Sequence, residues 1–416
     1  MNLNKNRMKN LFKISAAVAL TIAVSFTACK DDEGNVGGDN EEAKVADFIS
    51  NYANIVSANY TDSYNTAVAM QTKINAFLAA PSEAGLVEAQ EAWLYARNFY
   101  GQTEAFRQAK GPIDTEDLLG TEGQINAWPL DEGFIDYVSD NRGAEIQNGL
   151  IGDETFELSE ANILGQNEAN NVTENVSTGW HAIEFLLWGQ DLNYNPETNT
   201  ADNFSGSGER PYTDYTTADF AERRGEYLSV VTDLLVADLK DLNDTWVVGG
   251  SYRTTFEDLD EDTALTNILN GIGFISNGEV AAERLDPAID EGQENEHSCF
   301  SDNTTQDMWA NVTGLNNVIV GSYITEAGTT VSGTSLIEIV SEANVETATN
   351  LTTAASTAIT KLEVLTGLTI NFDEIISQES FESVGPAGEL SQALKDQGEA
   401  IAEAATALNV SISISE

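Results

Sequence analysis

The sequence is poor in cysteine, histidine, proline and basic residues. Its 416 residues include two cysteines, two histidines and seven prolines. Two cysteines exclude a disulfide-rich scaffold and a paired CxxC metal or redox motif, and so few prolines leave long helices unbroken. Nineteen basic residues stand against 68 acidic ones, which gives a formal net charge of −49. That charge repels nucleic acid and anionic lipid headgroups, so we expect cationic partners and no nucleic acid.

The first 28 residues have the layout of a signal peptide. Basic residues up to Lys13 precede an uncharged, mostly apolar run over 14–28, which is too short to span a bilayer comfortably. The run ends in residues 26–29, Phe-Thr-Ala-Cys, which resemble the lipobox of bacterial lipoproteins. We therefore expect cleavage before Cys29 and a membrane anchor through a lipid on that cysteine. The alternative is a buried helix that happens to end in cysteine.

Residues 29–42 are predicted to form a flexible acidic tether, because they are rich in Gly, Asn, Asp and Glu. Lipidation of Cys29 leaves Cys299 as the remaining thiol and rules out an intramolecular disulfide. The acidic cluster over 30–33 resembles a surface-export signal of bacterial lipoproteins. It favours the extracellular face of the outer membrane for the folded part of the chain, and the alternative is the periplasm.

Apolar residues at three- and four-residue spacing predict an all-α protein. We expect a helical domain over 43–250 and a second over 251–416, both built as packed helical bundles. The predicted helices span 45–78, 82–109, 180–188, 217–246, 265–285 and several segments from 338 onward. Irregular structure is expected over 111–165 and in the polar loop 191–211, and β-branched alternation over 317–323.

His181 is one of only two histidines, and it lies in Gly-Trp-His-Ala-Ile-Glu, residues 179–184. On a helix, His181 and Glu184 project from one face about a turn apart, so both can meet one cation. Gly179 allows another backbone to approach closely. A buried hydrogen bond between the two side chains is the alternative interpretation.

The predicted helix 82–109 places Trp93, Arg97, Tyr100 and Glu104 on one stripe. A purely structural helix would place apolar residues there. The mixture suits the wall of a polar cleft, in which Arg97 pairs with Glu104 or Glu104 joins a metal. An ordinary salt-bridged face remains open.

The second histidine lies in the densest polar segment of the chain. Glu279 and Arg284 are placed on a helix predicted to end near 286–287, just before residues 294–304, Glu-Asn-Glu-His-Ser-Cys-Phe-Ser-Asp-Asn-Thr. This segment gathers carboxylates, an imidazole, hydroxyls and a thiol. We expect Cys299 to shape the turn, because an exposed reactive thiol in an exported protein would be oxidised.

These motifs together resemble the imelysin family. Residues 179–191 are similar to its Gly-x-His-x-x-Glu signature, residues 296–304 to its second hallmark, and the stripe on 82–109 to its first helix. The resemblance implies two four-helix-bundle-like domains with the signature at the cleft between them. It also implies an extracytoplasmic lipoprotein linked to iron acquisition, and family members have been classed as metallopeptidases.

The resemblance also implies a site. The metal ligands would be His181, Glu184 and Glu104. Supporting residues of the cleft would be Gly179, Trp93, Arg97, Glu279, Arg284, Glu296, His297, Ser301, Asp302 and Asp307. The cofactor would be a divalent cation, iron first and zinc or manganese otherwise. It would arrive as an ion or a chelate, with proteins of an uptake system as partners.

Three functions remain open from the sequence. The first is cation binding for iron uptake. The second is a metallopeptidase, against which stand the absence of His-Glu-x-x-His and the presence of Phe185 where an inverted motif has its second histidine. The third is a surface protein that binds a polysaccharide or a partner protein, to which Tyr194, Tyr212 and Tyr215 would contribute.

Overall fold

Long helices account for most of the computed structural model, which describes residues 37–139, 145–147, 149–191, 194–195, 200–201 and 206–415. The predicted signal peptide and Cys29 lie outside the described residues. Helix α2 begins at Gly37, within the segment predicted as a tether. Among the helices described, none combines the length and the hydropathy needed to cross a bilayer.

The α-helices follow one another as α2 (Gly37–Ala79), α3 (Glu83–Thr103), α4 (Glu122–Ile125), α5 (Glu132–Ile135), α6 (Gly149–Gly152), α7 (Glu160–Leu164), α8 (Gly179–Trp188), α9 (Ala221–Trp246), α10 (Ser251–Glu257), α11 (Glu261–Phe274), α12 (Asp286–Glu291), α13 (Thr304–Val320), α14 (Leu336–Ala343), α15 (Val345–Thr366), α16 (Phe372–Ile376) and α17 (Pro386–Ala407).

Shorter elements connect these helices. A π-helical stretch, η4 (Ile275–Leu285), joins α11 to α12. The 3₁₀ turns are η1 (Glu104–Phe106), η2 (Ala169–Asn171), η3 (Tyr212–Tyr215) and η5 (Gln293–Asn295). Three antiparallel hairpins pair β1 (Val138–Ser139) with β2 (Glu145–Gln147), β3 (Tyr194–Asn195) with β4 (Thr200–Ala201), and β5 (Ser322–Ile324) with β6 (Thr330–Ser332).

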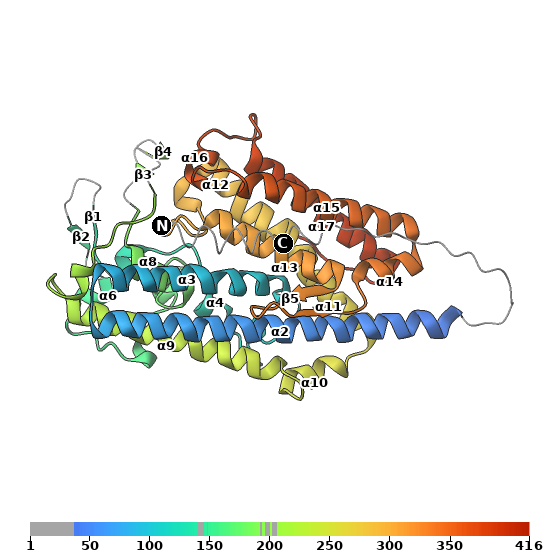
Figure 1. Cartoon of the computed structure of the whole chain (residues 1–416), viewed down its shortest axis with the longest axis horizontal. Helices are drawn as coiled ribbons and strands as arrows, with labels where there is room; N and C mark the ends of the chain where they lie inside the picture. The colour runs from blue at the N-terminus through green and yellow to red at the C-terminus, as the bar shows by residue number, and fades with distance from the viewer. Residues whose placement is uncertain are drawn as a thin grey trace. The chain divides into compact units, whose positions relative to one another are not determined.

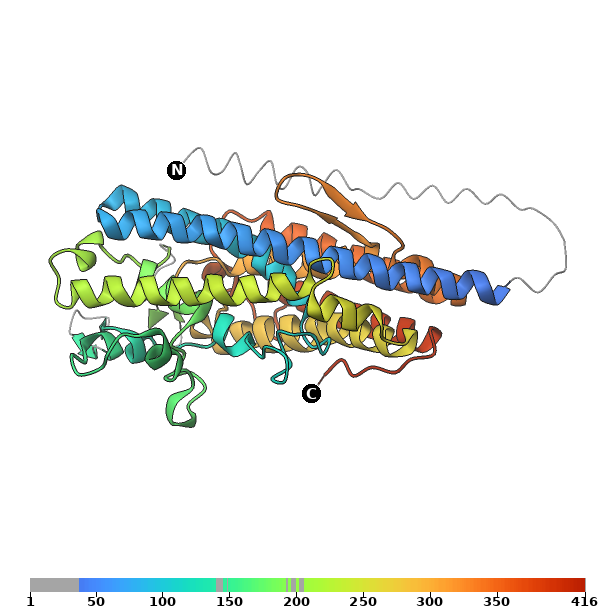
Figure 2. The same cartoon turned by 90° about the horizontal axis from the view of Figure 1, so that it is seen from below.

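The first half of the chain packs α2, α3, α8 and α9 together. Helices α2 and α9 lie side by side in both views (Figures 1 and 2), and Thr61 Oγ1 donates to Asn243 Oδ1 over 2.8 Å. Asn59 Nδ2 donates to the carbonyl oxygen of Phe99 over 3.0 Å, which ties α2 to α3. Ser82 caps α3 by accepting from the backbone N–H of Gly85, as its position before the apolar periodicity predicts.

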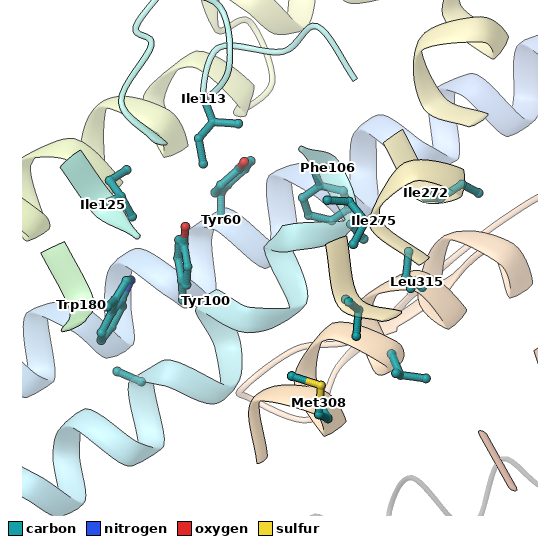
Figure 3. Close-up of a cluster of buried hydrophobic side chains, with 14 of the residues drawn as sticks. Tyr60, Tyr100, Phe106, Ile113, Ile125, Trp180, Ile272, Ile275, Met308 and Leu315 are labelled. Carbon is teal, nitrogen blue, oxygen red and sulfur yellow. The ribbon is translucent and has the colours of Figure 1, made fainter. Parts of the chain in front are cut away.

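The second half packs α11, η4, α13, α15 and α17, and α13 also contacts α3 of the first half. A Cβ on Gly314 of α13 would lie 2.3 Å from the carbonyl oxygen of Gln102, so only glycine permits this close approach. One continuous apolar core joins both halves, and Figure 3 draws side chains of it from Trp180 to Leu315. The all-α fold is confirmed. The boundary at residue 250 stays a prediction, while residues 41–416 form one compact unit.

Two local expectations are wrong. The helix expected to end near residue 286 continues through α12 to Glu291, because Pro287 occupies the first turn of α12, where a missing N–H costs no hydrogen bond. Residues 317–320, expected as β-branched alternation, form the last turn of α13. Val318 and Ile319 are buried in the core there, so packing overrides their intrinsic preference for strands.

Three buried charged side chains link the loop that precedes β1 to helix α9. Asp136 Oδ2 accepts from Arg210 Nη1 over 2.7 Å and from Arg224 Nε over 2.6 Å, and all three side chains are almost inaccessible. Burial by itself would raise the pKa of Asp136, but the two guanidinium groups outweigh it and hold that pKa below its usual value.

We predict that Asp136→Asn lowers the free energy of unfolding by about 3–5 kcal/mol at pH 7, because it leaves two buried arginines without their shared carboxylate. The lowered pKa means that this stability is present above pH 4 and is lost as the pH falls through the folded-state pKa. Urea unfolding at pH 7, 5 and 3 should show the difference from wild type shrinking only at pH 3. Asp244→Asn, which breaks an exposed pair with Lys240, is the control, and an undiminished difference at pH 3 contradicts the assignment.

Candidate functional site

Helix α8 is buried along its whole length. Its first residue, Gly179, has φ +88°, and a Cβ there would lie 2.5 Å from the carbonyl oxygen of Ile125. Thr178 Oγ1 donates to the carbonyl oxygen of Gln124 over 2.9 Å. The chain thus seats α8 directly against residues 124–125, and the polar side chains of α8 must find partners inside the protein.

His181 and Glu184 contact each other as their spacing predicts. His181 Nδ1 lies 2.9 Å from Glu184 Oε2, and both side chains are buried. Glu184 Oε1 accepts from the backbone N–H and the hydroxyl of Ser301, at 3.0 and 2.6 Å. Burial raises the pKa of Glu184 to about 8, while the Ser301 hydroxyl acts in the opposite direction. Burial and then Arg97 hold the pKa of His181 well below its usual value, so its ring is neutral.

The Arg97 guanidinium joins the first histidine to the segment of the second. It lies 3.3 Å from His181 Nε2, 3.3 Å from Asp307 Oδ1 and 2.5 Å from Asn126 Oδ1. Because a guanidinium only donates, His181 Nε2 accepts here. The proton of the neutral ring is therefore on Nδ1, from which it is donated to Glu184.

Aromatic rings surround the same guanidinium. The carbon atom at its centre lies 5.2 Å from the ring centroid of Tyr100, 5.8 Å from that of Trp180 and 5.9 Å from that of Trp93. Figure 3 shows Tyr100 and Trp180 next to each other, and their centroids are 5.5 Å apart. The stripe predicted on α3 is thus an aromatic enclosure for a buried cation.

His297 is held by Asp307, the carboxylate that also contacts Arg97. Asp307 Oδ2 accepts from His297 Nδ1 over 2.8 Å and from the hydroxyl of Ser298 over 2.5 Å. Burial by itself would raise the pKa of Asp307, but Arg97, His297 and Ser298 together hold that pKa well below its usual value. Burial lowers the pKa of His297 to about 4. The rings of His181 and His297 meet at 4.8 Å between centroids, so the fold brings the chain's only two histidines together.

A second charged cluster adjoins the first through Asn126. Arg284 Nη2 donates to Glu104 Oε2 over 2.8 Å and to Glu279 Oε1 over 2.6 Å, and Arg107 Nη1 lies 3.2–3.4 Å from carboxylate oxygens of the same two residues and of Glu122. Asn126 Nδ2 donates to Glu104 Oε1 over 3.3 Å. Burial would raise the pKa of Glu104, but the arginines outweigh it and lower that pKa to about 2.

A cavity of about 390 Å³ opens beside both clusters. Its chemically active lining comprises Arg107, Glu122, Trp128, Glu279, Glu283, Arg284 and His297. Since the ionised Asp307 accepts a hydrogen bond from His297 Nδ1–H, the proton of this neutral ring is on Nδ1 and Nε2 carries the lone pair. Imidazole and carboxylate groups on one cavity wall can bind a metal ion, while the arginines there can bind an anionic chelator.

Most of the predicted site residues belong to this network. It contains Trp93, Arg97, Glu104, Gly179, His181, Glu184, Glu279, Arg284, His297, Ser301 and Asp307. The expected pairing of Arg97 with Glu104 is wrong, because Asn126 lies between them and Glu104 pairs with Arg284 instead. Glu296 and Asp302 belong to a separate group of carboxylates.

Sequence reasoning missed Asn126, Arg107 and Glu122. Asn126 and Glu122 lie in the segment 111–165, whose irregular pattern gives no face on which to place a side chain. Arg107 stands three residues after Glu104, and that spacing was the one available signal for it.

We predict that Arg97→Met costs about 3–5 kcal/mol of unfolding free energy, because the substitution leaves Asp307 buried without its cation. Urea unfolding at pH 7 measures the loss. Lys73→Met removes an exposed cation paired with Glu88 on the surface and should leave stability unchanged. Equal effects of the two substitutions would show that Arg97 is not the counter-ion described.

Proteins of known sequence and structure resemble this chain. Iron-regulated protein A of Synechococcus elongatus is 28% identical over 110 residues, which make up 26% of this chain and 28% of that protein. Among solved structures, a protein of Parabacteroides distasonis described as an iron-regulated protein A precursor superposes with a TM-score of 0.65 at 18% identity, over 88% of this chain and 95% of that one. An imelysin-like protein of Psychrobacter arcticum superposes with a TM-score of 0.55 at 14% identity, over 93% and 100%. The family model described as Imelysin matches residues 56–414, and the chain therefore belongs to the imelysin family.

Proposed function

We propose that this protein is a lipid-anchored protein of the bacterial cell envelope that binds iron or another divalent cation in the cavity beside His297 and serves iron uptake. The observation that carries the proposal is the meeting of both histidines next to an acidic cavity. His297, Glu279 and Glu283 line it, and a nitrogen ligand combined with carboxylate oxygens suits iron, manganese or zinc.

The second layer of contacts supports His297 as a ligand. Metal-binding histidines usually donate their other ring N–H to a carboxylate, which orients the ring and makes it more basic. Asp307 stands in that position behind His297. Because the pKa of His297 is lowered to about 4, its ring is neutral at pH 7 and can bind a cation without first losing a proton.

His181, Glu184 and Glu104 remain predicted ligands. In the structure they have protein partners: Arg97 and Glu184 for His181, Ser301 for Glu184, and Arg284 for Glu104. In this proposal they stand behind the cavity and hold Arg97, Asp307 and His297 in place.

Two further observations favour an iron-related role. One relative is named as an iron-regulated protein in Synechococcus elongatus. The strong negative charge of this chain would also raise the local concentration of cations around it. The lipobox-like residues 26–29 support a membrane anchor, with the outer membrane as the expected location.

We predict that the chain from Lys30 onward takes up one Fe²⁺ in the cavity and that His297→Ala weakens this binding by more than about 100-fold. That loss exceeds the 10- to 100-fold typical of a residue that only orients a ligand, which is the range expected for His181→Ala. Anaerobic titration calorimetry, repeated with Zn²⁺ and Mn²⁺, measures both affinities. Glu283→Gln should also weaken binding, because Glu283 lines the cavity, and its exposed position limits the cost of this isosteric substitution to folding.

Glu291→Gln is the matched control, since Glu291 is exposed and lies outside the cavity lining. Unchanged Fe²⁺, Zn²⁺ and Mn²⁺ affinities in His297→Ala and Glu283→Gln would refute the cavity as the binding site. Peptide hydrolysis by wild type that His297→Ala abolishes would instead establish the metallopeptidase alternative.

We predict that Cys29→Ala moves the full chain from the membrane fraction to the soluble fraction of cells, because the substitution removes the acceptor of the lipid. Labelling with a radioactive fatty acid should mark wild type and not the variant. Cys299→Ala is the control, and an equal loss of label in that variant would point to the wrong cysteine.

A further inference from the structure

Three carboxylates from distant parts of the chain meet outside the cavity. Asp191 follows α8, Asp302 precedes α13, and Asp373 lies in α16. One oxygen from each lies within 4.8 Å of the other two. Asp191 and Asp373 are buried and Asp302 is partly buried, so this group is not a solvated acidic surface.

Glu296 adds a fourth carboxylate to this group, beside the side chains of Asp373 and Thr304. Its side chain is fully buried, and both of its oxygens lack a hydrogen-bond partner. It faces Asp373 and Asp302, which act on its charge, and Asp373 Oδ2 is likewise buried without a partner. A buried carboxylate without partners is costly, so these oxygens require a ligand or a proton.

Within the described part of the chain, no salt bridge joins Glu296, Asp302 or Asp373 to a lysine or arginine. Burial, followed by Asp373 and Asp191, raises the pKa of Asp302 to about 8. A bound cation would relieve both the burial cost and the mutual repulsion.

We propose that Glu296, Asp191, Asp302 and Asp373 bind one calcium ion. The donors are all oxygens, without nitrogen or sulfur, which selects a hard cation over iron(II) or zinc. Gln293, which is hydrogen-bonded to Asp191, supplies a buried amide oxygen without a partner. Ca²⁺ takes six to eight oxygens in flexible geometry, a number that these side chains reach with bidentate carboxylates and water, whereas Mg²⁺ demands a strict octahedron.

Calcium at this position would hold in place the segment 296–302, which contributes His297 and Ser301 to the site around Arg97. Glu296 directly precedes His297, whose ring Asp307 holds. Asp302 directly follows Ser301, whose hydroxyl donates a hydrogen bond to Glu184. Asp191 and Asp373 tie that segment to the end of α8 and to α16. The calcium ligands are distinct from the cavity residues, so this proposal does not depend on the proposed function.

The test compares calcium binding and thermal unfolding for the chain from Lys30 onward, first treated with EGTA. We expect titration calorimetry to give one Ca²⁺ per chain, with Mg²⁺ binding more weakly, and 1 mM Ca²⁺ to raise Tm by at least about 3 °C. The double substitution Asp302→Asn with Asp373→Asn should abolish calcium binding. Its Tm in EGTA should equal or exceed that of wild type, because the substitutions remove two carboxyl groups that crowd each other when no cation is bound.

Asp117→Asn with Asp290→Asn removes the same charge from exposed positions and should leave calcium binding intact. Glu296→Gln provides a second variant should the double one fail to fold, and it should bind calcium at least 10-fold more weakly. His297→Ala should keep calcium binding, and the double variant should keep Fe²⁺ binding, so the two sites can fail separately. Wild type without calcium uptake and with equal Tm in EGTA and Ca²⁺ would overturn the proposal.

Discussion

The arrangement of the site depends on the buried Arg97 guanidinium. Its charge is stabilised by three aromatic rings and by Asp307, and its N–H groups reach His181 and Asn126. Because a guanidinium cannot accept a hydrogen bond, it fixes which nitrogen of His181 carries the proton. Through Asp307 it fixes the same choice in His297. One cation thereby sets the protonation of both histidines.

Acidic residues far outnumber basic ones in this chain, and two groups of carboxylates with opposite pKa shifts stand out among them. Glu104, Asp136 and Asp307 each face arginine, which lowers their pKa and keeps them ionised. For Glu296 and Asp302, burial and then neighbouring carboxylates raise the pKa. Arginines of the protein neutralise the carboxylates of the first group. Those of the second group are neutralised only by a proton or a bound cation. This difference separates a structural ion network from a candidate metal site.

The sequence anticipated those parts of the site that lie within a single turn of helix. His181 and Glu184 meet because residues three apart on a helix are neighbours, and Arg97 lies on the mixed stripe that its spacing predicted. The partners of these groups were harder to foresee. Asn126 comes from an irregular segment and separates Arg97 from Glu104. Glu104 pairs instead with Arg284, which lies in the π-helical stretch η4, distant in sequence.

The sequence by itself determined the all-α class, the imelysin family and the residues of the two hallmark segments, since helical periodicity and short motifs are properties of neighbouring residues. Only the tertiary structure decided that the two histidine rings meet beside a cavity that His297 lines, and that Asp302 and Glu296 join Asp191 and Asp373 instead. Those contacts join residues from distant parts of the chain, and their positions follow from how the whole core packs, which no local pattern encodes.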